Sequence, residues 1–126
     1  MNTQQFQSCI EACYACATAC DTCAASCLQE DDPKMMAGCI ALDMDCAQIC
    51  RTAAGFMARG SEMAAMVCKT CEEVCEACAR ECGQHQAQHC QDCAAACNRC
   101  AAECRAMAGN LPGWKQQQAG QMPAAH

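Results

Sequence analysis

The nineteen cysteines of this 126-residue chain follow one another at a spacing that strongly limits how it can fold. In three stretches each cysteine comes three or four residues after the last, and a shorter set keeps this rhythm with one position missing. Steps that average 3.5 residues place every sulfur on one side of an α-helix, whereas a strand would need a period of two. The four sets are Cys9, Cys13, Cys16, Cys20, Cys23 and Cys27; Cys39, Cys46 and Cys50; Cys68, Cys71, Cys75, Cys78 and Cys82; and Cys90, Cys93, Cys97, Cys100 and Cys104.

Local signals mark the ends of the four helices. Asp32-Pro33 is typical of a helix start, because proline is favoured at the first helical position. Gly60-Ser61 combines a glycine that ends one helix with a residue suited to capping the next, and Gly83 is placed to end the third. The predicted helices span residues 3–28, 33–58, 62–83 and 86–108.

Short connections between these helices make sequence neighbours antiparallel. The predicted fold class is therefore all-α: an antiparallel up-down-up-down four-helix bundle with a cysteine-lined core. We expect residues 1–109 to form this bundle as one domain. Residues 110–126, rich in Gln, Gly, Pro and Ala, are expected to form a flexible C-terminal tail.

Composition indicates that the cysteines also fill the interior of the bundle. Val, Ile, Leu and Phe together number ten, well below the share that a hydrocarbon core requires. Alanine, the best helix former, occurs 27 times, and the net charge of −6 is modest, so disorder is disfavoured. With eight basic residues against fourteen acidic ones, the chain is not expected to bind nucleic acid.

The sequence also predicts the cellular compartment of the protein. No stretch approaches the ~20 apolar residues of a membrane span. The first six residues show neither a basic region nor an apolar region of a secretory signal. We therefore expect a cytoplasmic protein with no membrane partner. Thiols stay reduced in that compartment, where dense cysteine favours metal binding over disulfides.

Neither simple packing nor disulfide bonding accounts well for so many cysteines. Buried cysteine can act as a small hydrophobe, but alanine, leucine or valine would pack as well without the risk of oxidation. Disulfides within a helix are disfavoured because Cβ vectors at i, i+3 and i+4 are nearly parallel, and the number of cysteines is odd. Metal binding is the role that we infer.

The spacing also discriminates among metals. Tetrahedral zinc sites use four ligands each, so nineteen thiolates would hold only four or five ions. Iron–sulfur proteins use cysteine spacings that differ from the strict alternation seen here. Cu(I) is soft and accepts two or three sulfurs, so bridging thiolates would hold roughly one ion per cysteine with little net charge. Multiple Cu(I) ions are the favoured cargo and zinc is the weaker alternative.

Cysteine-lined stripes on four helices, with C-x₃-C-x₂-C-x₃-C repeated, resemble the cytosolic branch of the four-helix-bundle copper storage proteins. The resemblance runs from about residue 6 to residue 107, and its most similar stretches are 38–43 (GCIALD), 75–78 (CEAC) and 81–85 (ECGQH). It implies storage of many Cu(I) ions inside each bundle, for copper buffering, detoxification and supply to copper enzymes. It also implies a homotetramer.

Four residues besides cysteine are candidates for metal contact. Asp43 occupies the vacant stripe position between Cys39 and Cys46, where a carboxylate needs a partner. His85 continues the third stripe above Cys82, whereas His89 lies off the strict stripe. Both histidines are predicted ligands, and Met36 at the same end is a candidate thioether for copper uptake.

The opposite end of the bundle is predicted to be a hydrophobic plug of Phe6, Phe56, Met57 and Met107. Acidic residues such as Glu72 are expected on solvated helix faces.

Catalysis has little support in the sequence. No set of nucleophile, base and orienting residue is visible, so we do not predict an enzyme. A catalytic thiol would need an exposed cysteine of low pKa, and the cysteines here lie within the stripes. Zinc sequestration and delivery of copper to a client remain alternatives to storage, and copper donor or acceptor proteins are the expected partners.

Overall fold

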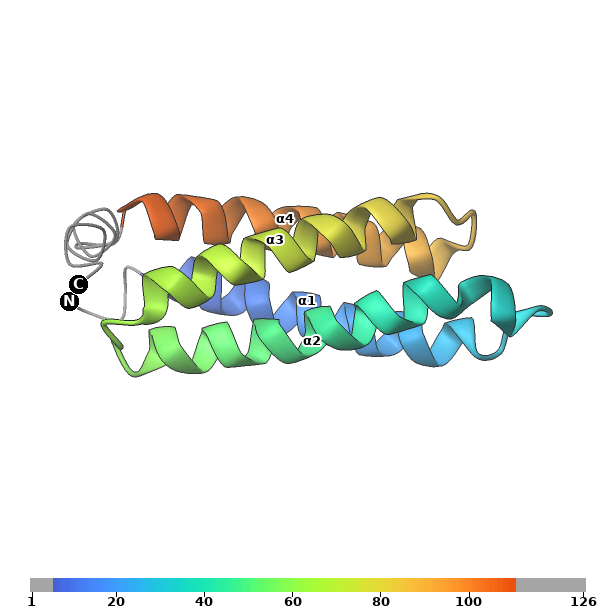
Figure 1. Ribbon diagram of the computed structural model, residues 1–126, viewed down its shortest axis with the longest axis horizontal. Helices are drawn as coiled ribbons and strands as arrows, with labels where there is room; N and C mark the ends of the chain where they lie inside the picture. The colour runs from blue at the N-terminus through green and yellow to red at the C-terminus, as the bar shows by residue number, and fades with distance from the viewer. Residues whose placement is uncertain (1–5, 111–126) are drawn as a thin grey trace, which may run out of the picture.

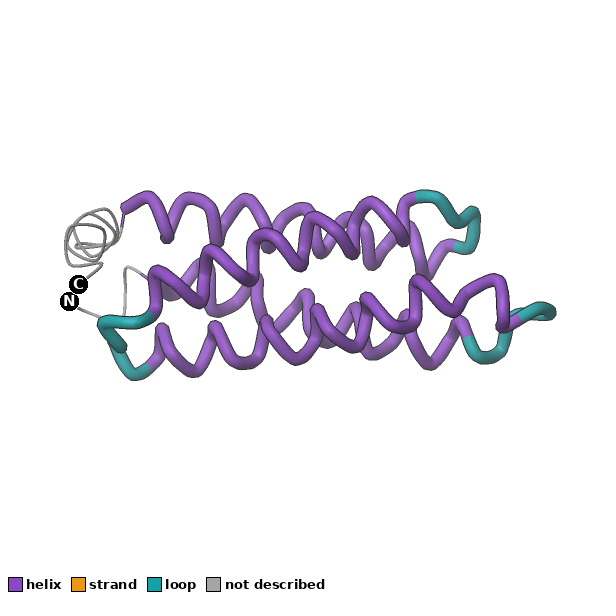
Figure 2. Tube along the Cα trace, in the orientation of Figure 1, coloured by secondary structure: helices purple, strands orange, loops and turns teal. Residues whose placement is uncertain are grey.

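The structure is a computed structural model that describes residues 6–110 of the chain. Four long helices, α1 (Gln7–Cys27), α2 (Ala37–Ala58), α3 (Ala64–Gly83) and α4 (Gln88–Asn110), form an antiparallel bundle (Figure 1). Helices α1 and α3 each pack against both α2 and α4. The described residues contain no strand (Figure 2). The predicted all-α four-helix bundle is confirmed.

The helix boundaries differ from the predicted ones by a few residues. A short 3₁₀ segment, η2 (Pro33–Met36), precedes α2, and the Met35 N–H donates to the Asp32 carbonyl at 3.1 Å. Helix α4 begins two residues later than predicted and reaches Asn110. Its start is delayed because the Gln91 side-chain amide donates to the carbonyls of Gly83 and His85, which closes residues 84–87 into a loop. Residues 1–5 and 111–126, including nearly all of the predicted tail, lie outside the described residues.

The turn between α2 and α3 follows from one glycine. Gly60 has a φ of 63°, a left-handed conformation that glycine adopts at little cost. Its N–H donates to the Met57 carbonyl at 2.9 Å, and the Ser61 N–H donates to the Phe56 carbonyl at 3.0 Å. This pair of hydrogen bonds is a Schellman motif, which satisfies carbonyls at a helix end. The predicted role of Gly60 is confirmed.

The two ends of the bundle are built from different residues (Figures 1 and 2). One end carries the α1–α2 connection and the α3–α4 loop, and we call it the histidine end because His85 and His89 lie there. The other end carries the α2–α3 turn and the start of α1, and we call it the phenylalanine end. Phe6 and Met57 are fully buried at the phenylalanine end, as the predicted plug requires.

The interior between the ends is made of thiols and small side chains. All nineteen cysteines are fully buried, and alanines such as Ala53 and Ala54 fill much of the remaining space. None of the helices within residues 6–110 combines the length and apolar character that crossing a bilayer requires.

One acidic residue is not where the sequence predicts. Glu72 is only 5% exposed, because Arg105 of α4 reaches it at 2.7 Å and Lys69 reaches it at 3.3 Å. Burial opposes its charge, but these two cations outweigh burial and hold the pKa of Glu72 below its usual value. Arg105 also bonds to Glu76. The expectation of a solvated Glu72 was wrong because helix periodicity carries no information about a partner on another helix.

Candidate metal centre

The sulfur atoms of all four helices meet along the axis of the bundle, in an arrangement that we call the thiol column. The Sγ of Cys16 lies 3.6 Å from that of Cys97 and 3.7 Å from that of Cys46, so α1, α4 and α2 meet at one level. Helix α3 joins through Cys75, whose sulfur is 3.6 Å from those of Cys46 and Cys50. All nineteen cysteines are free thiols. The structure thus brings the four predicted stripes together.

Four-sulfur groups in the middle of the thiol column overlap with one another. Among residues 6–110, nine groups of potential metal ligands each have their ligand atoms within 4.8 Å of one another; at least five of these consist of four cysteines, and three of those five share members. Cys16 and Cys46, for example, belong to two of these groups, and Cys20 and Cys97 link one of them to a third. Isolated tetrahedral sites would need four dedicated thiolates for each ion. Shared neighbours instead suit thiolates that bridge two metal ions.

Asp43 is the polar residue inside the thiol column. It is fully buried on α2, and its Oδ1 accepts S–H bonds from Cys78 and Cys82 at 3.3 Å and from Cys93 at 3.2 Å. Burial raises the pKa of Asp43 to about 8. The carboxyl group is therefore mainly protonated at neutral pH, and the metal-free core holds it without an uncompensated charge. The vacant stripe position between Cys39 and Cys46 indicated this placement.

Thiols near the histidine end also keep their protons in the absence of metal. Burial raises the pKa of Cys90 to about 11 and raises the pKa of Cys23 and Cys39 as well. Since a metal binds the thiolate form, each ion that enters must displace protons. The centre therefore couples metal binding to proton release.

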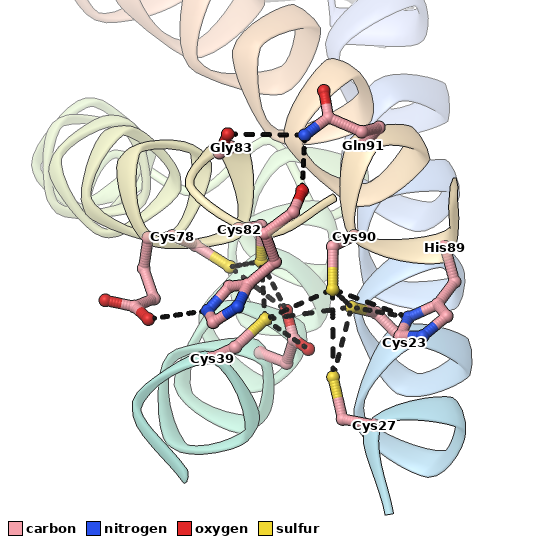
Figure 3. Close-up of polar contacts among 12 residues, drawn as sticks. Cys23, Cys27, Cys39, Cys78, Cys82, Gly83, His89, Cys90 and Gln91 are labelled. Carbon is pink, nitrogen blue, oxygen red and sulfur yellow. Dashed lines mark hydrogen bonds and ion pairs between the residues drawn. The ribbon is translucent and has the colours of Figure 1, made fainter. Parts of the chain in front are cut away.

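His89, at the start of α4, contacts thiols directly (Figure 3). Its Nδ1 lies 3.5 Å from the Cys23 sulfur and 3.6 Å from the Cys90 sulfur. Its Nε2 lies 2.8 Å from Oε2 of Glu30, which follows the end of α1. Cys27 and Cys39 complete a group of four thiols with Cys23 and Cys90. An imidazole nitrogen therefore contacts two sulfurs of this four-thiol group.

His85 has different neighbours. It lies in the loop after α3, and its Nε2 is 3.0 Å from Oε2 of Glu81. Among the described residues, no sulfur is within hydrogen-bonding distance of its ring. The sequence placed His85 on the stripe and His89 off it, and the structure reverses this order. The reason is that α3 ends at Gly83, so the loop beyond it no longer follows the helical period.

Two further residues complete the histidine end. Met36, in η2, is 7% exposed and belongs to the buried core, as its proposed position at this end requires. Glu30 had no predicted role as a partner of His89. The two residues are 59 positions apart, and only the return of α4 alongside α1 brings them together.

Comparisons with known proteins give a consistent result. A family model described as Csp, copper storage protein, matches residues 2–109. Among curated proteins, an uncharacterized cysteine-rich protein, YhjQ, of Bacillus subtilis is 46% identical over 82 residues, which are 65% of this chain and 76% of the relative.

Two solved structures are similar over most of their length. The Cu(I)-bound copper storage protein BsCsp3, from Bacillus subtilis, is 45% identical with a TM-score of 0.80, and the match covers 82% of this chain and 98% of that one. A cytosolic copper storage protein from Streptomyces lividans, with five coppers, is 36% identical with a TM-score of 0.83. That match covers 86% of this chain and 96% of the other.

Proposed function

The chain belongs to the copper storage protein family, and from that premise we propose that it stores about one Cu(I) ion per cysteine inside its bundle. The observation that carries this proposal is the sharing of sulfurs among neighbouring groups in the thiol column. Cu(I) accepts two or three thiolates, so each sulfur can serve two ions. One positive ion per thiolate also leaves little net charge in the core.

The residues proposed to hold copper are those of the thiol column and its histidine end. The nineteen cysteines bind most of the ions. Asp43 and His89 have direct contacts with thiols and are proposed to bind the ions near the histidine end. His85 and Met36 lie at the same end and are proposed to assist copper uptake. Copper therefore enters and leaves at the histidine end.

This store would serve copper buffering, detoxification and supply of copper to enzymes through donor or acceptor proteins. The family is one of storage rather than catalysis. A cytoplasmic location is supported by the similar Streptomyces lividans protein, which is described as cytosolic. We also propose a homotetramer, for which light scattering on the purified 13.4 kDa chain should give about four times the chain mass.

Anaerobic titration of the full metal-free chain with Cu(I) tests the storage proposal. Uptake should continue to about one ion per cysteine and release about one proton per thiol. Saturation near four or five ions would contradict the proposal and favour the tetrahedral zinc alternative.

A matched pair of variants locates the capacity in the thiol column. Replacing Cys46 and Cys50 with Ala removes two buried sulfurs and should lower the capacity by about two ions. Replacing Met35 and Met44 with Ala should leave the capacity unchanged, because these side chains are 72% and 62% exposed. Circular dichroism of each metal-free variant verifies that the helices still form.

A further inference from the structure

The Glu30 carboxylate is hydrogen-bonded to Nε2 of His89, and the other ring nitrogen of His89 contacts thiols. We infer that Glu30 is a positioning residue for copper exchange, which holds His89 in the tautomer whose Nδ1 lone pair faces Cys23 and Cys90. The inference rests on the proposed storage of Cu(I). It concerns how the histidine end is prepared before any ion arrives.

The tautomer follows from what each neighbour of the ring can do. A neutral imidazole carries a hydrogen on one nitrogen and a lone pair on the other. A carboxylate only accepts hydrogen bonds, so Oε2 of Glu30, at 2.8 Å, requires the hydrogen on Nε2 of His89. Nδ1 then presents its lone pair, which can accept an S–H bond from Cys23 or Cys90 and can bind Cu(I).

A backbone hydrogen bond holds Glu30 next to the end of α1, within reach of His89. Its N–H donates to the Cys27 carbonyl at 3.2 Å, so the residue continues directly from the last turn of α1. His89 comes from the first turn of α4. The side chains of Glu30 and His89 are 39% and 20% exposed, and their contact links α4 to the chain that continues from α1. The carboxylate contacts Nε2 and the thiols contact Nδ1, so the imidazole ring lies between them and the carboxylate can orient the ring that faces the thiols.

The other histidine of the histidine end provides an internal comparison. His85 also has a carboxylate on Nε2, that of Glu81, but no sulfur within hydrogen-bonding distance among the described residues. Of the histidines in residues 6–110, His89 therefore combines a carboxylate on one nitrogen with thiols on the other. Partners of this kind fix the tautomer of ligating histidines, and losing one typically weakens metal binding or activity 10- to 100-fold.

Three substitutions in the full chain separate orientation from charge. Glu30→Ala removes the acceptor, and Glu30→Gln keeps an oxygen that can accept from Nε2 while removing the charge. Asp31→Ala removes an equal charge from the exposed neighbouring residue. The tautomer of His89 is measured in the metal-free protein by ¹⁵N NMR of labelled histidines. Exchange is measured as the rate of Cu(I) transfer to bathocuproine disulfonate.

We expect the Nε2–H tautomer in the unmodified chain, in Glu30→Gln and in Asp31→Ala, with transfer rates within about twofold of one another. Glu30→Ala should populate the Nδ1–H form, which turns the lone pair away from the thiols. Transfer of the outermost ions should then be about tenfold slower. An unchanged tautomer or an unchanged rate in Glu30→Ala overturns the inference. Equal effects of Asp31→Ala and Glu30→Ala also overturn it, since charge alone would then explain both.

Failure of the storage proposal would be visible separately. If the unmodified chain takes up few Cu(I) ions in the titration, the proposed function fails for a reason unrelated to Glu30. The NMR measurement needs no copper, so it still decides whether Glu30 sets the tautomer of His89.

Discussion

The two ends of the bundle differ in what holds their side chains in place. At the phenylalanine end, Phe6 and Met57 are fully buried, and such side chains each contribute about 1.5–3 kcal/mol relative to exposure. At the histidine end, His89 and Glu30 remain partly exposed and hold their places by hydrogen bonds. Apolar burial excludes water at the phenylalanine end, whereas the histidine end places an imidazole beside thiols in a partly exposed position.

On the proposed function, this contrast allows one bundle to hold many ions and still release them. An ion within the thiol column has sulfur neighbours from several helices. An ion at the histidine end meets mixed ligands at the boundary with solvent, where an acceptor can compete for it. On the proposed function, the phenylalanine end keeps the helices together while the histidine end exchanges metal.

The largest expected effect compares two methionines at opposite ends. Met57→Ala should destabilise the metal-free protein by about 2–5 kcal/mol, because it leaves a cavity in the fully buried plug. Met35→Ala makes the same chemical change at a residue that is 72% exposed, and should alter stability by less than about 0.5 kcal/mol. Urea unfolding followed by circular dichroism measures both. Equal losses would show that the plug is not the stabilising end.

A somewhat smaller effect concerns pH and the residue just inside the histidine end. Asp43 has a pKa of about 8 in the folded protein and about 3.9 when unfolded, so the folded state binds its proton more tightly. Its contribution to stability is complete below pH 4 and is lost as pH rises toward 8. Between pH 5 and pH 7.5 the metal-free bundle should lose about 3 kcal/mol from this group.

Asp43→Asn removes the titrating group and keeps a similar shape, so it isolates this contribution. Urea unfolding of both proteins at pH 5, 6, 7 and 7.5 gives the difference between the two pH profiles, in which the histidines and other groups cancel. Parallel profiles would mean that Asp43 is already ionised in the folded bundle.

These tests concern features that sequence reasoning reached with unequal success. The spacing of the cysteines predicted their burial because a period of 3.5 residues fixes which face of a helix is covered. The same period placed Asp43 in the thiol column, since it occupies a vacant stripe position. Where helices are continuous, periodicity locates a side chain without any knowledge of its neighbours.

Periodicity fails where a helix ends or where a partner comes from another helix. His85 left the stripe because α3 stops at Gly83, and His89 gained its thiol contacts from the way that α4 restarts after the loop. Glu30 and Glu72 have their partners, His89 and Arg105, on another helix, 59 and 33 positions away in the chain. Such pairs depend on three-dimensional packing, which one sequence without relatives does not reveal.

The smallest expected effect tests which end exchanges copper. His89→Ala should slow transfer of Cu(I) to a chelator about tenfold, because it removes the nitrogen that faces Cys23 and Cys90. His85→Ala should slow the transfer by a smaller factor, about twofold, because that ring is bound to Glu81 and can only assist at the entrance. Met57→Leu, a substitution of similar volume in the plug, should leave the rate unchanged.

Stopped-flow absorbance of the chelator complex, after equal Cu(I) loading, compares the three variants with the unmodified chain. Capacity should fall by no more than about one ion in His89→Ala, since thiolates hold the rest. A slower rate in Met57→Leu with a normal rate in His89→Ala would reverse the assignment of the two ends. Equal effects of His85→Ala and His89→Ala would mean that the loop rearranges on copper binding and brings His85 to the thiols, because only such a movement gives both rings access to the same ions.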